Sequence, residues 1–271
     1  MLLSVAMIGL NEESCIRQAL KSVESIADEI IFVDTGSTDS TIQIAEEFGA
    51  KLIRHQWIDN FSVVRNIALD NCSGEWILSL DCDEYVDLSE LPSDFSKALL
   101  FNETDVAYAV EIENLLPGGE IDRHVDIRLF RNTPAIRFCN PIHESVSPSI
   151  LRLVPNAQIS MLPLKINHSG YRVARNNKNK LIRNRNILLR WTEDEPDNPY
   201  AWYKLGLTLK ALSAEQATAC LFRSFELLIA HEDRGSFAFR FELLESLKGS
   251  LEGVNKPLEK FVNAQWEAAF S

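Results

Sequence analysis

The sequence predicts an α/β fold followed by a small all-α region, and three observations predict it. Short apolar runs alternate with amphipathic segments over residues 1–100, a pattern typical of a parallel sheet whose two faces are covered by helices. Two of these runs end in aspartate. From Arg172 onward the strand pattern stops, and helical periodicity continues to the C-terminus.

The first part of the chain reads as four strands that alternate with three helices. The expected strands are Ser4–Ile8, Glu29–Asp34, Lys51–Arg54 and Trp76–Leu80, and the expected helices are Glu12–Ser25, Thr41–Phe48 and Asn60–Asn71. Ile16, Leu20 and Val23 recur at helical spacing in the first helix. Asp39 supplies an N-cap region for the second helix, and Gly49 ends it.

A second stretch rich in β signals follows. Four further β segments are expected at Val106–Glu113, Asp126–Arg131, Leu151–Val154 and Gln158–Ile166. The first two flank Pro117-Gly118-Gly119, which predicts a hairpin-like loop between them. We place the domain border between Tyr171 and Pro199, and predict one domain over residues 1–175 and a helical region over residues 176–271.

Composition excludes several classes of protein. The chain has 27 Lys+Arg against 39 Asp+Glu, a formal net charge of −12, which argues against a nucleic-acid partner because phosphate binding needs a basic surface. The five cysteines show no CxxC spacing and are expected to be free thiols in a reducing compartment. The apolar run Met1–Leu10 lacks a basic residue before it and is followed by Asn11-Glu12-Glu13. We therefore expect a cytoplasmic protein whose first strand is buried.

Carboxylates stand where two expected strands end. Asp34 closes one strand, and Asp81-Cys82-Asp83-Glu84 follows another. Open α/β sheets bind ligands outside the carboxyl ends of their strands, and carboxylate oxygens suit Mg²⁺ or Mn²⁺ shared with substrate phosphates. Asp-x-Asp alone is a weak motif, and these acids could instead cap helices. At the end of an apolar strand, the pattern favours a metal or nucleotide site.

Four ordered motifs resemble the family 2 glycosyltransferases. They are Asn11-Glu12-Glu13, Val33-Asp34-Thr35-Gly36-Ser37-Thr38-Asp39, Trp57-x-x-Asn60-Phe61-Ser62-x-x-Arg65-Asn66 and Gly74-Glu75-Trp76-Ile77-Leu78-x-Leu80-Asp81-x-Asp83-Glu84. Three later segments look like the acceptor side of one subgroup, which often carries a tetratricopeptide (TPR) extension: Arg128-Leu129-Phe130-Arg131-Asn132, Ile142-His143-Glu144 and His168-Ser169-Gly170-Tyr171. The resemblance implies a GT-A fold, a Rossmann-like mixed sheet flanked by helices.

The resemblance also implies a reaction, transfer of a sugar from a nucleoside-diphosphate-sugar donor with inversion at the anomeric carbon. A UDP-sugar is the first expectation, with a hydroxyl (or thiol) on a glycan, glycolipid or peptide as acceptor and Mg²⁺ or Mn²⁺ as cofactor. The resemblance places Glu12 and Glu13 beside the nucleotide, Asp34 at the nucleobase, and Asp39 where it supports the nucleobase pocket. It places Asp81 at the ribose and metal, and Asp83 at the metal.

Inverting transfer needs one positioned base to take the acceptor proton. Glu144 is the first candidate, beside His143, and Asp122 and Asp126 are held in reserve. The alternative is that Glu144 forms a structural ion pair with one of three arginines, Arg128, Arg131 or Arg137.

Two further residues have two interpretations each. His168 either contacts the metal or diphosphate or is a hydrogen-bonded structural residue. Arg65 either reaches the donor diphosphate or pairs with an acid at the sheet end.

A basic stretch separates the two predicted regions. Its members are Arg172, Arg175, Lys178, Lys180, Arg183, Arg185 and Arg190. Most of them read as a solvated helix face, although one or two could meet the diphosphate or an anionic lipid surface. Peripheral association with the inner face of the membrane is therefore kept as an expectation.

The C-terminal region carries one partial TPR match. Trp202-x-x-Leu205-Gly206, Phe222 and Phe225 fit a TPR unit, whereas Leu209 and Thr218 stand where an aromatic residue and Ala are usual. Such a region could form a homodimer, dock a protein acceptor or only complete the fold. Two alternative functions stay open: a non-catalytic TPR-bearing scaffold derived from a glycosyltransferase, and a nucleotidyltransferase.

Overall fold

The computed structural model describes residues 2–89, 105–116, 119–155, 157–168, 177–230 and 239–251, together with 260, 262 and 264. It divides the chain into two compact units, Met1–Ala174 and Arg175–Ser271. Each unit is described by itself.

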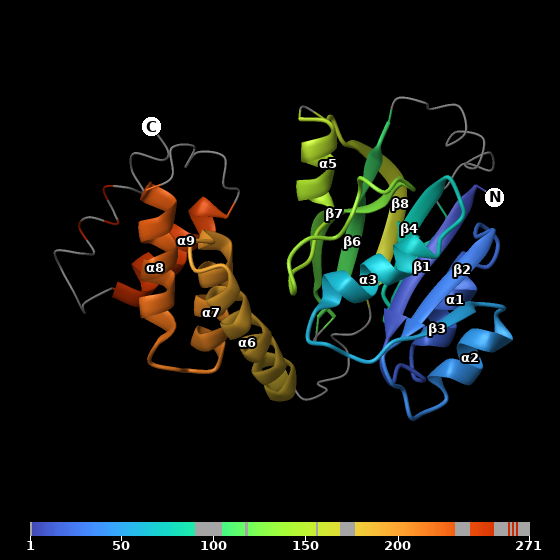
Figure 1. Ribbon diagram of the computed structural model, residues 1–271, viewed down its shortest axis with the longest axis horizontal. Coiled ribbons are helices and arrows are strands. Elements are labelled where there is room, and N and C mark those ends of the chain that lie inside the picture. Colours follow the sequence, from blue (N-terminus) through green and yellow to red (C-terminus); the bar gives the residue numbers. More distant parts are fainter. Residues whose placement is uncertain are drawn as a thin grey trace. The chain divides into compact units, whose positions relative to one another are not determined.

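The first unit is built on one mixed sheet (Figure 1). Its described strands are β1 (Leu3–Gly9), β2 (Glu29–Asp34), β3 (Lys51–Arg54), β4 (Trp76–Ser79), β5 (Glu84–Asp87), β6 (Ala107–Leu115), β7 (Ile121–Arg131) and β8 (Ser160–His168). They lie in the order β3-β2-β1-β4-β7-β6-β8-β5. Strands β3, β2, β1 and β4 are parallel, and β7 joins β4 and β6 in antiparallel fashion. The predicted mixed α/β sheet is confirmed.

Helices cover both faces of this sheet. They are α1 (Ile16–Val23) and α2 (Thr41–Glu47) on one face, and α3 (Phe61–Asp70) and α5 (Ser147–Leu153) on the other. Side chains alternate across the sheet as strand geometry requires. Phe32 packs in the first core, which lies beneath α1 and α2. Ile31 and Val33 pack in the second core, which lies beneath α3 and α5.

One expectation about local structure was wrong, and one strand was missed. Most of the strand expected at Leu151–Val154 is the last turn of helix α5, and Val154 is its C-cap residue. The N-cap residue Val146 and Ile150, four positions later, are both buried in the core beneath the helix. Strand β5 was not predicted, and it pairs antiparallel with β8.

The second unit is helical in its described parts. It contains α6 (Asn177–Asp194), α7 (Pro199–Ala211), α8 (Ala217–Ala230) and α9 (Arg240–Leu251). Helices α7 and α8 pack so closely that a Cβ added at Gly206 would lie 2.7 Å from the Leu221 side chain. Ser224 Oγ also donates to Pro199 O at 2.6 Å. Among the described residues, no helix is both long enough and apolar enough to cross a bilayer.

Candidate active site

The loops after β1 and β2 meet at one edge of the sheet, because parallel strands end on the same side. Asp34 closes β2, is 3% exposed, and accepts hydrogen bonds from Gly36 N at 3.0 Å and Ser37 N at 3.1 Å. These bonds fold the loop back over the end of the strand. The carboxylate predicted at the nucleobase is therefore held rigidly at the sheet edge.

The β1 loop is tied to the start of α2. Glu13 N donates to Asp39 Oδ2 at 3.2 Å, and Glu13 Oε2 accepts from Ser40 N at 3.0 Å. Glu12 N donates to Thr41 Oγ1 at 2.7 Å. The residues joined by these three hydrogen bonds are 26, 27 and 29 positions apart along the chain. The structure thus brings together the loop residues that were predicted beside the nucleotide.

The acidic turn after β4 is closed by reciprocal hydrogen bonds. Asp81 N donates to Glu84 Oε2 at 2.9 Å, and Glu84 N donates to Asp81 O at 3.1 Å. Glu84 is 3% exposed, and its other oxygen accepts from Arg128 Nη2 at 2.9 Å. Burial raises the pKa of Glu84, and the charge of Arg128 opposes that rise. Glu84 therefore fixes the turn that carries Asp81 and Asp83.

Arg65 joins this turn to the predicted base. Its Nη2 lies 2.7 Å from Asp81 Oδ1, and its Nε lies 2.7 Å from Glu144 Oε1. The side chains of Arg65 and Glu144 are only 11% and 12% exposed. Burial alone would raise the pKa of Asp81, but the charges of Arg65 and then Arg128 lower it to about 2. Asp81 is consequently ionised across the physiological range.

The ion pair of Glu144 involves a different arginine from the three that the sequence suggested. Arg128 pairs with Glu84, Arg131 with Glu75 and Arg137 with Asp70. Arg65 is the partner of Glu144 and also pairs with the sheet-end acid Asp81, as one of its two interpretations expected. The two carboxylates are separated by one guanidinium.

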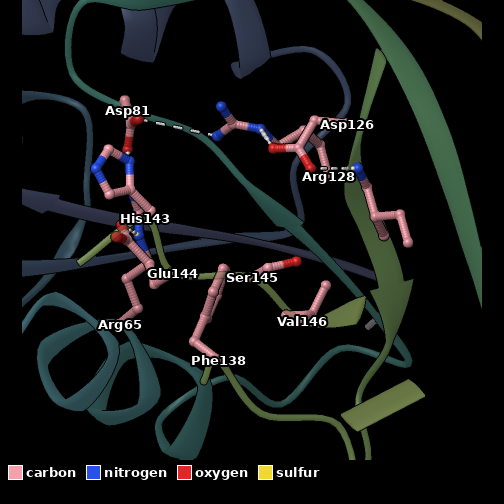
Figure 2. A pocket seen from close by; sticks show the side chains of 10 residues that line it. Arg65, Asp81, Asp126, Arg128, Phe138, His143, Glu144, Ser145 and Val146 are labelled. Carbon is pink, nitrogen blue, oxygen red and sulfur yellow. Dashed lines mark hydrogen bonds and ion pairs between the residues drawn. The ribbon is translucent and has the colours of Figure 1, made fainter. Parts of the chain in front are cut away.

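A small pocket opens between these groups (Figure 2). Its volume is about 200 Å³. Arg65 and Glu144 lie on one side, and Asp126 and Arg128 lie on the other, with Arg128 Nε 3.2 Å from Asp126 Oδ2. The full lining is Arg65, Asp81, Asp126, Ile127, Arg128, Phe138, His143, Glu144, Ser145 and Val146. The pocket has room for a single sugar-sized group rather than a drug-sized ligand.

Asp83 and His168 form a second group of interacting side chains beside the acidic turn. His168 Nε2 lies 3.1 Å from Asp83 Oδ2, and its Nδ1 lies 2.9 Å from Asn114 Oδ1. Among the described residues, no group of three or more His, Cys, Asp or Glu side chains gathers at one point. A carboxylate and an imidazole still fit a divalent ion that takes its remaining ligands from a diphosphate and water.

His168 predicts a pH dependence of stability in metal-free protein. Burial would lower the pKa of His168, but the hydrogen bond and charge of Asp83 raise it above 6.5. A raised pKa adds stability that is fully present below the unfolded pKa and is lost as pH rises through the folded pKa. With a chelator present, His168→Gln should therefore lower the urea midpoint more at about pH 5.5 than at about pH 8.5. An equal decrease of the urea midpoint at both pH values would contradict an ion pair between His168 and Asp83.

Residues 4–138 match the model of the family described as Glycosyl transferase family 2. The chain belongs to glycosyl transferase family 2. It is 38% identical over 208 residues to a TPR repeat-containing protein of Synechococcus elongatus, covering 75% of this chain and 51% of that protein. It is 28% identical over 219 residues to the SPbeta prophage-derived glycosyltransferase SunS of Bacillus subtilis, covering 79% of this chain and 50% of that one. The chain thus spans about half the length of these relatives.

A solved structure shares the fold of this family 2 chain. The crystal structure of S. aureus TarS 1-349 aligns with a TM-score of 0.51 at 16% identity, over 100% of this chain and 89% of that one. The same fragment in complex with UDP aligns with a TM-score of 0.50 at 18% identity, with the same coverage. Together with the family match, this likeness confirms the predicted family and the GT-A fold.

Two residues of the site were missed from the sequence, Glu84 and Asn114. Glu84 was noted only as a third acid of the turn, and nothing local indicated that it would be buried. Asn114 did carry a signal, because Val110, Ile112 and Asn114 recur with period two and share the buried face of β6. A polar residue in that series indicates a buried hydrogen-bond network.

Of the remaining predicted residues, Asp126 lines the pocket, and the others lie outside it or outside the described residues. Asp122 does not line the pocket and instead accepts from Asn114 Nδ2 at 3.3 Å, whereas its fellow reserve Asp126 does line it. Arg172 and Arg175 lie outside the described residues. The other members of the basic stretch lie on α6 in the second unit.

Proposed function

We propose that this chain is an inverting glycosyltransferase that moves a sugar from a UDP-sugar to a hydroxyl (or thiol) acceptor with the help of Mg²⁺ or Mn²⁺. The observation that carries the proposal is the pair of ion pairs that Arg65 forms. They link Asp81, on the acidic turn after β4, to Glu144, on the wall of a sugar-sized pocket. In this proposal Asp81 belongs to the donor side and Glu144 to the acceptor side, and the Arg65 guanidinium lies between the two carboxylates.

The proposed chemistry is one displacement. The acceptor oxygen forms a bond to the anomeric carbon while the bond from that carbon to the diphosphate oxygen breaks. The acceptor proton passes to the Glu144 carboxylate, and the nucleoside diphosphate leaves. A divalent ion bound by Asp83 and His168 would supply Lewis-acid stabilisation of the departing diphosphate. No carboxylic acid is then needed to protonate the leaving group.

The donor side of the proposal rests on the loops after β1 and β2. We assign Glu12, Glu13, Asp34 and Asp39 to the nucleotide, since the structure ties these loops into one rigid edge. Asp81 faces the ribose and metal in this assignment, and its low pKa keeps it charged. UDP is the first probe, since a protein of the same fold, TarS 1-349, has been crystallised with it.

A donor screen tests the proposal. UDP-, GDP- and dTDP-sugars are incubated with the protein and Mn²⁺, release of nucleoside diphosphate is measured, and the modified acceptor is identified by mass analysis. Turnover with one donor class supports the proposal. UDP binding without turnover of any donor favours the scaffold alternative, and release of a sugar 1-phosphate instead of a nucleoside diphosphate favours a nucleotidyltransferase.

Glu144→Gln tests the base. The amide keeps the size of the side chain but cannot accept the acceptor proton, so kcat should fall by about 10²–10⁴-fold. The KM for the donor should change little, because no contact with the donor is assigned to Glu144. Asp126→Asn, on the opposite wall, is the matched control and should retain most of kcat. Full turnover by Glu144→Gln would remove this residue from the mechanism and turn attention to Asp126.

The helical unit has a proposed role as well. We assign residues 176–271 to a TPR-like region. Two observations support this: helices α7 and α8 pack closely against one another, and one relative is named for its TPR repeats. Such a surface could dock the acceptor protein or a second copy of the chain. Size-exclusion chromatography with light scattering distinguishes a homodimer from a monomer that docks a partner.

A further inference from the structure

Asn114 stands at the centre of a chain of side chains that crosses three strands. On β6 it pairs directly with Asp122 of β7 and with His168 of β8. Directly paired residues of neighbouring strands share one face of a sheet. Asn114 is only 6% exposed, so its amide must be satisfied by these neighbours.

The neighbours fix which way the amide points. Asn114 Nδ2 lies 3.3 Å from Asp122 Oδ2 and 3.2 Å from His124 Nδ1. An ionised carboxylate can only accept hydrogen bonds, so the NH₂ half of the amide must face Asp122. The carbonyl half, Oδ1, therefore faces His168, whose Nδ1 lies 2.9 Å away.

The amide in turn fixes the tautomer of His168. A carbonyl oxygen can only accept, so the proton shared with Asn114 must sit on His168 Nδ1. The doubly protonated ring donates from Nδ1 to Asn114 and from Nε2 to Asp83, whereas a neutral ring that keeps its proton on Nδ1 has a lone pair at Nε2. That atom points at Asp83, with 3.1 Å between Nε2 and Oδ2. A neutral imidazole nitrogen and a carboxylate oxygen are both ligands for a divalent cation.

We infer that Asn114 is a positioning residue that holds His168 in the Nδ1–H tautomer and aims Nε2 at a divalent cation beside Asp83. The metal part of this inference rests on the proposed function, whereas the tautomer part does not. Asn114 does not touch the substrate or the ion and acts only through His168. Partners of this kind, which accept a hydrogen bond from a ligating histidine, change metal affinity by about 10–100-fold when removed.

Two variants separate positioning from mere packing. Asn114→Leu fills the space but removes the acceptor, and should weaken Mn²⁺ binding by about 10–100-fold in calorimetric titrations with UDP present. The double variant Asn114→Asp/Asp122→Asn exchanges the two groups, so that a carboxylate accepts from His168 and an amide donates to it from β7. This exchange should restore most of the affinity. Glu113→Gln, at the preceding residue of β6, is the control and should leave the Mn²⁺ affinity unchanged.

A second readout needs no metal. In the metal-free protein, at a pH where the ring is neutral, the ¹⁵N chemical shifts of His168 should report a protonated Nδ1, and Asn114→Leu should shift the population toward Nε2–H. A wild-type ring with its proton on Nε2 would overturn the inference outright. So would unchanged Mn²⁺ affinity in a folded Asn114→Leu variant when His168→Ala weakens binding.

The same measurements keep the inference apart from the proposed function. If wild-type protein binds no Mn²⁺, or if His168→Ala binds it as tightly as wild type does, the metal role assigned to His168 fails. The ¹⁵N spectrum then still decides whether Asn114 sets the tautomer. Thermal unfolding of each variant shows whether it has folded before its affinity is interpreted.

Discussion

Asp83→Asn should reduce sugar transfer by about 10²–10³-fold, with most of the loss in kcat. The substitution keeps the shape of the side chain and its place 3.1 Å from His168 Nε2, but removes the charge that the proposed cation needs. Charge that develops on the departing diphosphate is then stabilised less in the transition state than in the wild-type protein. The same variant should lose the dependence of UDP binding on Mn²⁺, as measured by titration calorimetry.

The control for this variant is Asp87→Asn, at the far end of β5. It removes the same charge four residues further along the chain, but its carboxylate accepts from Ser89 N at 2.9 Å and does not line the pocket. Activity close to wild type is expected there. If Asp83→Asn keeps its turnover and its Mn²⁺-dependent UDP binding, the metal-assisted transferase mechanism fails, whatever the control shows.

The sequence could predict the part of the fold and site that local patterns determine. Continuous apolar runs such as Glu29–Asp34 are buried on both faces, so their boundaries follow from hydrophobicity alone and the observed strand has the predicted bounds. Asp34 and Asp81 could be placed at a sheet edge because they directly follow such runs. The roles of these acids remain predictions.

The rest depends on contacts between distant residues, which no local pattern contains. Arg65 and Glu144 are 79 positions apart, and Arg128 and Glu84 are 44 positions apart. Glu84 can occupy a buried position in β5 only because Arg128 and the turn satisfy it, and the sequence of the strand itself does not contain those contacts. Helix α5 was read as a strand for a related reason, because its helical state depends on packing against the second core.

Arg65→Met should lower the free energy of unfolding by about 3–5 kcal/mol, the cost of leaving buried charges without their partner. Methionine keeps much of the side-chain volume of arginine, but Asp81 and Glu144 lose a cation that lies 2.7 Å from each of them. Urea unfolding followed by circular dichroism at neutral pH measures the loss. Arg17→Met removes an ion pair whose side chains are 54% and 56% exposed, and should cost about 0–1 kcal/mol.

A double variant shows whether charge rather than packing causes the loss. Adding Glu144→Gln to Arg65→Met removes one uncompensated carboxylate, and should recover part of the stability even though it deletes a second native side chain. The pKa of Asp81 is about 2 in the wild-type protein, below its ordinary value of 3.8, so its contribution to stability is fully present above pH 3.8 and is lost as pH falls through about 2. Without Arg65 the Asp81 carboxylate should protonate at higher pH, and the difference in unfolding free energy between wild type and variant should narrow between neutral pH and about pH 4. A gap that is constant over this range, with no recovery in the double variant, would assign the loss to packing and leave Arg65 without an electrostatic role.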